Sequence, residues 1–303
     1  MKNFFCWISA TMMLIFCSSC AVLTDSQLKM VENLAWKADT VVSSPVYIFK
    51  SLSHIRMERG LYYAASLNSA DARYNEINAM AEAVVSDKST IRKAGIYIDV
   101  INSYVRAVGS LSNDERWRGV GREFRGIGSK VDSLIMFYNK LNVKDEIPVG
   151  FSKLAGKTLG VLSEKIMKGE RAAFLKDFII EGDTLISVCV DSLCGILKGD
   201  KMNSLIENEC EGLQNNYKIY LSVMETRGLY PEMEADRHYI ELYEEAAGIK
   251  QIRNKCVSAL RSFKNAHGKL ARALENEEDI QFYPQLLEFN QMTSELCRMI
   301  KTL

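Results

Sequence analysis

The feature that most constrains the fold is the spacing of apolar residues, which recur three and four positions apart over long stretches of the chain. On a helix of 3.6 residues per turn this spacing places them along one face, whereas a strand would need strict alternation. Only four prolines, at 45, 148, 231 and 284, interrupt the pattern. Each lies where one helix could give way to the next, because proline is disfavoured inside a helix and tolerated in its first turn. The clearest stretch is Ile91, Ala94, Ile98, Ile101, Val105, Val108 and Leu111.

The same spacing predicts helices over most of the chain: 25–42, 45–85 with a break near Asn68 and Ser69, 91–111, 117–141, 148–168, 171–197, 202–227, 231–274 and 281–302. Ser112 to Glu115 has the form of a capping box, so 91–111 and 117–141 are expected to form an antiparallel hairpin. The segment 231–274 would be a rod about 65 Å long. The predicted fold class is therefore all-α, an elongated antiparallel helical bundle of about seven to nine helices.

Two stretches have the composition of linkers. Residues 142–150 combine charges with a proline and a glycine, and they divide the chain into an N-terminal helical part, 25–147, and a C-terminal helical part, 148–303. Residues 228–231 are the second candidate. A single bundle is the leading architecture, and two packed helical subdomains that meet near residue 148 are the alternative.

The N-terminus has the pattern of an export signal. Residues 1–3 carry one positive charge, residues 4–16 form an apolar run, and Ser18-Ser19-Cys20 ends the stretch with small residues before a cysteine. The apolar run is short for a membrane span, which needs about 20 residues.

This stretch resembles the N-terminus of bacterial lipoprotein precursors, with Cys17-Ser18-Ser19-Cys20 as the lipobox, although Cys17 stands where leucine is usual. The resemblance implies that residues 1–19 are a signal peptide, that Cys20 becomes the lipidated residue, carrying acyl chains such as palmitate, and that residues 20–24 form the tether. Ala21 favours the outer membrane, because proteins retained in the inner membrane typically carry Asp there. A plain secretory signal and an uncleaved anchor helix are the alternatives.

Charge excludes some partners. The chain has 38 basic and 38 acidic residues, and removal of residues 1–19 takes away one lysine and no acid, which leaves 37 and 38. This balance supplies no field for nucleic acid or anionic lipid head groups. The resemblance to lipoprotein precursors implies a membrane as partner, through the lipid on Cys20, and an unidentified envelope protein is the other expected partner.

No cofactor site is predicted. Gly156-Lys157-Thr158 resembles the end of a phosphate-binding loop, but the required glycine is missing at Phe151 and no strand precedes it. The glycine-rich run at 119–128 has Phe124 where a dinucleotide fingerprint needs its third glycine. Close helix packing is the preferred explanation of these glycines.

The three histidines give little support for metal or acid–base chemistry. His267 lies in the apolar stripe of 231–274 and is expected to be a core residue with satisfied hydrogen bonds. His238 has Glu234, Glu241 and Glu245 at helical spacing. A solvated acidic face is preferred there over a metal site, because metal sites in bundles draw carboxylates from several helices. His54 has no recognisable partner.

Five cysteines follow Cys20, at 189, 194, 210, 256 and 297. Cys189 and Cys194 would lie about 8 Å apart on a continuous helix, beyond the reach of a disulfide. Longer-range disulfides and buried thiols both remain open.

Three classes of function follow. The preferred one is a non-enzymatic envelope lipoprotein that acts as a protein-binding or structural module, which a contiguous exposed apolar patch would support. The second is a bundle that binds a small apolar or peptide ligand in its core, which would need an internal pocket. The third is a metal-assisted enzyme, which would need buried carboxylates that face one another around His238.

Overall fold

The computed structural model describes residues 23–113, 168–276 and 283–302, together with 132, 133, 136, 139 and 140. The described residues form helices and connecting turns, without strands, as an all-α chain should. The helices are α2 (Asp25–Ser43), α3 (Pro45–Ser66), α4 (Ala70–Ser112), α7 (Lys168–Lys198), α8 (Asp200–Thr226), α9 (Met233–Glu275) and α10 (Tyr283–Lys301). None of them is both long and apolar enough to cross a membrane.

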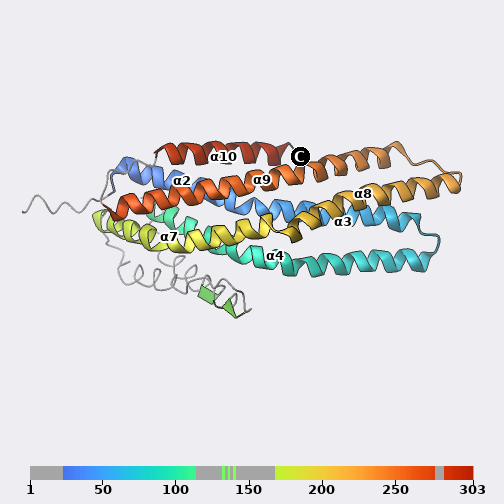
Figure 1. Ribbon diagram of the computed structural model, residues 1–303, viewed down its shortest axis with the longest axis horizontal. Helices are drawn as coiled ribbons and strands as arrows, with labels where there is room; N and C mark the ends of the chain where they lie inside the picture. Colours follow the sequence, from blue (N-terminus) through green and yellow to red (C-terminus); the bar gives the residue numbers. More distant parts are fainter. Residues whose placement is uncertain are drawn as a thin grey trace, which may run out of the picture.

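The helices form an elongated antiparallel bundle (Figure 1). α2 and α3 follow one another in the same direction, α4 returns beside them, α7 and α8 again run outward, and α9 returns along the whole bundle. α10 lies along the C-terminal half of α9 and also contacts α2. With 43 residues each, α4 and α9 are about 65 Å long. The predicted rod at 231–274 is confirmed as α9.

Local sequence explains where the helices begin and end. Thr24 and Gln27 form a capping box before α2, in which each side chain accepts a hydrogen bond from the other's backbone N–H. Pro45 occupies the first turn of α3, where its missing N–H has no consequence. The side chain of Ser69 caps α4. Gly228, with φ of 66°, ends α8 in the left-handed conformation that suits glycine.

Most of the predicted helices are confirmed, and the predicted break near Asn68 and Ser69 separates α3 from α4. The predicted end near residue 85 is wrong, because α4 continues without interruption to Ser112. The predicted helix at 148–168 and the linker at 142–150 lie outside the described residues, apart from position 168. So does the helix at 117–141, apart from isolated positions.

The predicted capping box at 112–115 is only partly described. Ser112 is the last residue of α4, and its hydroxyl donates to the carbonyl oxygens of Val108 and Gly109 at 2.9 and 3.0 Å. Glu115 lies outside the described residues.

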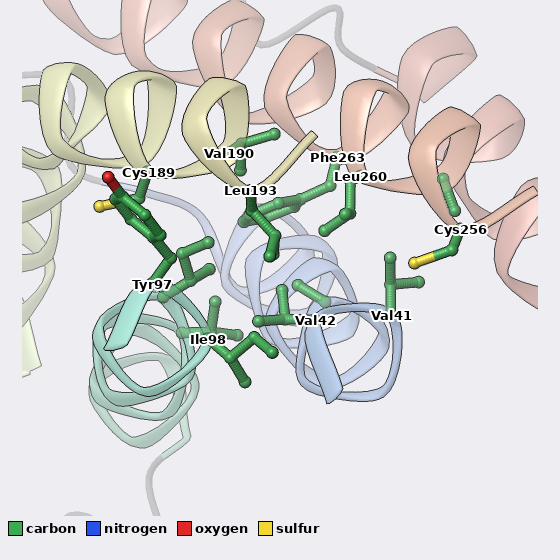
Figure 2. Close-up of a cluster of buried hydrophobic side chains, with 14 of the residues drawn as sticks. Val41, Val42, Tyr97, Ile98, Cys189, Val190, Leu193, Cys256, Leu260 and Phe263 are labelled. Atoms are coloured by element: carbon green, nitrogen blue, oxygen red, sulfur yellow. The ribbon is translucent and has the colours of Figure 1, made fainter. Parts of the chain in front are cut away.

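The core is shared by helices from both halves of the chain (Figure 2). Side chains of α2, α4, α7 and α9 meet in it: Val41, Val42, Tyr97, Ile98, Cys189, Val190, Leu193, Cys256, Leu260 and Phe263. α10 extends this core, since the ring of Phe289 lies 5.7 Å from that of Phe263. Burial of these apolar faces is the main term that stabilises such a bundle.

Candidate functional site at the end of the bundle

The turns from α3 to α4 and from α8 to α9 lie at the same end of the bundle, opposite the beginning of α2 (Figure 1). Arg227, which follows α8, ties the two turns together. Its guanidinium donates to the carbonyl oxygens of Ala65, Ser66 and Leu67 and to the side-chain oxygen of Asn68, over 2.6 to 3.4 Å. The carbonyls of Ala65 and Ser66 are the last two of α3, which have no partner within their own helix, and Leu67 is its C-cap. The end of the bundle is therefore a fixed surface.

Large apolar side chains are exposed on the connection between α8 and α9. Leu229 is 51% exposed, Tyr230 90% and Met233 74%. We call these three residues the apolar loop. Ile240 and Tyr243, further along α9, are also exposed. Single exposed apolar residues are common on protein surfaces, and this group, close together in sequence, is the candidate interaction surface of the described chain.

Behind the apolar loop, tyrosines from α3, α8 and α9 pack against one another. The ring of Tyr217 stacks on that of Tyr239 at 4.1 Å and meets that of Tyr62 edge-on at 4.9 Å. The Tyr62 hydroxyl donates to the carbonyl oxygen of Ala235 at 3.0 Å, and the Tyr217 hydroxyl donates to the carboxylate of Asp236. Both acceptors lie in the first turn of α9, so the tyrosines fix this helix against α3 and α8.

These tyrosines have protonated hydroxyls at neutral pH. Burial, and then the charge of Glu58, raises the pKa of Tyr62 to about 12. Burial and the hydrogen bond to Asp236 also raise the pKa of Tyr217 well above its ordinary value. Both residues therefore serve as hydrogen-bond donors and packing surfaces.

A second group of polar residues lies between α3 and α9, where the carboxylate of Glu58 lies close to both His54 and His238. His54 Nδ1 lies 3.1 Å from Glu245 Oε2, and His238 Nε2 lies 3.0 Å from Glu58 Oε2. Glu58 also lies 3.9 Å from His54, one helical turn away. The expectation that His54 has no partner is wrong. Its signal in the sequence was Glu58, four residues later on the same helix face.

The acidic face predicted around His238 is present only in part. Glu241 lies 4.0 Å from His238, whereas Glu245 pairs with His54, and Glu234 accepts a hydrogen bond from Arg237 at 3.0 Å. Within the described ranges, no group of three or more His, Cys, Asp and Glu side chains is arranged to hold a metal ion.

His267 is a core residue with satisfied hydrogen bonds, as predicted. Its Nδ1 lies 2.8 Å from Asp183 Oδ1 on α7, and its Nε2 lies 2.7 Å from the hydroxyl of Tyr104 on α4. The carboxylate can only accept, so Nδ1–H donates to Asp183 and lowers the pKa of that carboxyl group. Gly182 leaves room for Tyr104, since a Cβ there would lie 2.3 Å from the tyrosine ring. This Asp–His–Tyr chain joins three helices.

The hydroxyl of Tyr104 is fully enclosed, and burial raises its pKa well above the ordinary value. The hydrogen bonds from Tyr104 through His267 to Asp183 therefore hold α4, α9 and α7 together in the core.

All five described cysteines are free thiols, which settles the choice that spacing left open. Burial raises the pKa of Cys189 and Cys256 to about 12 and that of Cys194 to about 11. These thiols remain protonated at neutral pH and pack as small apolar residues. Cys210 and Cys297 are partly exposed.

The fold defines the chain as an all-α antiparallel bundle with an exposed apolar surface at one end. No protein-family model, curated protein or solved structure matches it. The lipidation residue predicted at Cys20 lies outside the described residues.

Proposed function

We propose that this chain is a non-enzymatic lipoprotein of the bacterial envelope, anchored in the outer membrane by lipid on Cys20, that binds a protein partner through the far end of its bundle. The observation that carries the proposal is the position of the apolar loop. The described chain begins at Leu23 beside one end of the bundle, and the loop lies at the other (Figure 1). α9 alone separates the two ends by about 65 Å. An anchor at residue 20 would therefore leave the apolar loop far from its own attachment point.

Charge indicates what kind of partner fits this end. Residues 222–245 include seven acidic residues and two arginines. Arg227 is engaged with the end of α3, and Arg237 with Glu234. The exposed apolar side chains are thus flanked by acidic residues. A partner protein whose surface has an apolar centre and basic residues at its rim would be complementary to them. The same charge disfavours nucleic acid and anionic lipid.

The anchor is tested by expressing the full chain and its Cys20→Ala variant in a bacterial host. We expect a mature wild-type species that begins at Cys20, carries acyl chains in its intact mass and fractionates with the outer membrane. The variant should lack the acyl mass and leave the membrane fraction. A wild-type protein cleaved elsewhere and free of lipid would contradict the anchor.

The binding surface is tested in the same cells with a photo-crosslinking phenylalanine analogue at position 230, which preserves an aromatic ring. The matched control carries the analogue at Lys29, an exposed position near the other end of the bundle. We expect a protein adduct from position 230 alone, lost when Glu232 and Glu234 are both changed to Lys. An adduct with lipid, equal adducts from both positions, or an adduct that survives the charge reversal would contradict the proposed surface.

A further inference from the structure

Arg253, in the middle of α9, is a buried cation without a carboxylate partner. It is 6% exposed. Its Nη1 donates to the side-chain oxygen of Asn203 and its Nη2 to that of Asn254 at 3.2 Å, and both acceptors are neutral amides. Its Nε is buried and has no hydrogen-bond partner. No Asp or Glu in the part of the chain that the structure describes forms an ion pair with it.

Two partly buried arginines, Arg56 and Arg59, differ from Arg253 in having a carboxylate partner. Between α3 and α8, Arg56 and Arg59 each lie 2.6 Å from a different oxygen of Glu209, which is 2% exposed. A buried charge without a counter-ion is strongly unfavourable. Glu209 supplies that counter-ion for Arg56 and Arg59, whereas Arg253 has only dipoles.

A second source of positive potential lies beside Arg253. Asn203, its hydrogen-bond acceptor, belongs to the beginning of α8, a helix of 27 residues. The N-cap of α8 is Gly199, which provides no side-chain oxygen for the first N–H groups of the helix. The N–H groups of Met202 and Asn203 donate to the carbonyl oxygen of Gly199, so the N–H groups before them and the helix dipole are what favour an anion here. Lys198 and Lys201 flank the same junction, and Asp200 is the acidic residue of the first turn.

We propose that the junction between α7 and α8 binds one small oxyanion of the phosphate type, with Arg253 as its principal ligand. The guanidinium presents Nε–H and an Nη–H along one edge, a fork that matches two oxygens of an oxyanion. The bound anion neutralises Arg253 and gives its Nε–H an acceptor. This site is independent of the apolar loop, so it can fail without affecting the proposed function.

Inorganic phosphate is the probe. The melting temperature of the full mature protein is measured against phosphate concentration, with ionic strength held constant by chloride. We expect a rise of about 3 °C at ten times the dissociation constant, and no rise for Arg253→Met. The control Arg106→Met removes an exposed arginine that pairs with Asp39, and should keep the response. A wild type that does not respond, or an Arg253→Met variant that responds equally, would overturn the site.

A second variant keeps the proposal testable if Arg253→Met fails to fold. Asn203→Asp places a carboxylate where the amide oxygen now accepts from Arg253. It should raise the melting temperature without phosphate and abolish the phosphate response, because the counter-ion is then built in. Asn203→Asp that retains the response would overturn the site. Asn203→Asp also adds a negative charge near the N-terminus of α8, which is favourable with or without Arg253. Where Arg253→Met folds, the change in melting temperature caused by Asn203→Asp is therefore measured in the Arg253→Met variant as well as in the wild type. An equal rise in melting temperature in the two would also overturn the site.

Discussion

At the scale of single residues, the hydrogen bonds of His267 explain why a histidine can occupy the apolar stripe of α9. Changing Tyr104 to Phe keeps the ring that stacks on Phe178 at 5.2 Å but removes the donor to His267 Nε2. A buried acceptor left without a partner costs about 1–3 kcal/mol. We therefore expect Tyr104→Phe to lower the free energy of unfolding by about that amount in urea titrations.

The matched control is Tyr220→Phe, since no described residue forms a hydrogen bond with the hydroxyl of the partly buried Tyr220. Its free energy of unfolding should change little. Equal losses in the two variants would show that the hydroxyl of Tyr104 contributes nothing specific.

The same chain of hydrogen bonds predicts a dependence on acid. The hydrogen bond from His267 holds the pKa of Asp183 below its ordinary value in the folded protein. A carboxyl group with a depressed folded pKa contributes stability above its unfolded pKa, about 3.9, and loses it as the pH falls through the folded pKa. We expect Asp183→Asn to be less stable than the wild type at pH 6, with the difference shrinking below about pH 4 in urea titrations at each pH. A constant or growing difference would contradict this assignment.

Sequence reasoning could place His267 in the core but could not identify its partners. The stripe of Phe263, His267 and Leu270 follows from helical spacing. Asp183 and Tyr104 lie 84 and 163 positions away, and only the packing of α4, α7 and α9 brings them together. The link between His54 and Glu245 was missed for the same reason, whereas the neighbour Glu58 could have been found from its spacing.

At the scale of helices, Glu209 is the main polar contact between α3 and α8. Glu209→Gln would remove the carboxylate that lies 2.6 Å from both Arg56 and Arg59 in this partly buried site. Breaking a buried ion pair costs about 3–5 kcal/mol, and the partial exposure of both arginines places the expected loss near the lower value, about 3 kcal/mol. The measurement is urea unfolding beside Glu207→Gln, an exposed change on the same helix. Comparable losses in the two variants would contradict the prediction.

Substitution of two glycines by alanine should change the stability of the protein in opposite directions. Gly228 has φ of 66°, where an L side chain is strained, so Gly228→Ala should destabilise the protein by about 1–2 kcal/mol. Gly195 lies within α7, and a Cβ there would meet no atom within 4 Å. Gly195→Ala should stabilise the protein by about 0.5–1 kcal/mol. Changes of the same sign in thermal unfolding would contradict the assigned backbone conformations.

The length of α4 shows where the prediction of helix ends fails. The polar stretch Ser86 to Thr90 lies between the two predicted helices, 45–85 and 91–111. It contains neither proline nor glycine, so nothing in it breaks the backbone hydrogen bonds of a helix. In contrast, Pro45, Ser69 and Gly228 have direct conformational or capping effects, and the ends of helices near them were predicted well.

At the scale of the whole molecule, the sequence predicted long antiparallel helices and a hairpin of 91–111 with 117–141, but not which of the other helices lie side by side. The pairing decides the shape, since α2 with α3 and α7 with α8 form two interrupted rods that lie against α4 and α9 (Figure 1). The apolar loop depends on it too. Leu229, Tyr230 and Met233 become a surface at one end only because both helical turns lie there.

This pairing also predicts how the molecule unfolds. α3 packs on α8 and α9, and α4 packs on α7, so the described helices of 25–147 and of 148–303 each have apolar faces that the other part covers. We expect the full chain to unfold in one cooperative transition, with coincident urea curves from circular dichroism at 222 nm and from intrinsic fluorescence. Each half expressed alone should lack a cooperative transition, and the co-expressed halves should purify as a complex that regains it. Two separate transitions in the full chain, or one half that unfolds cooperatively alone, would instead establish two subdomains that meet near residue 148.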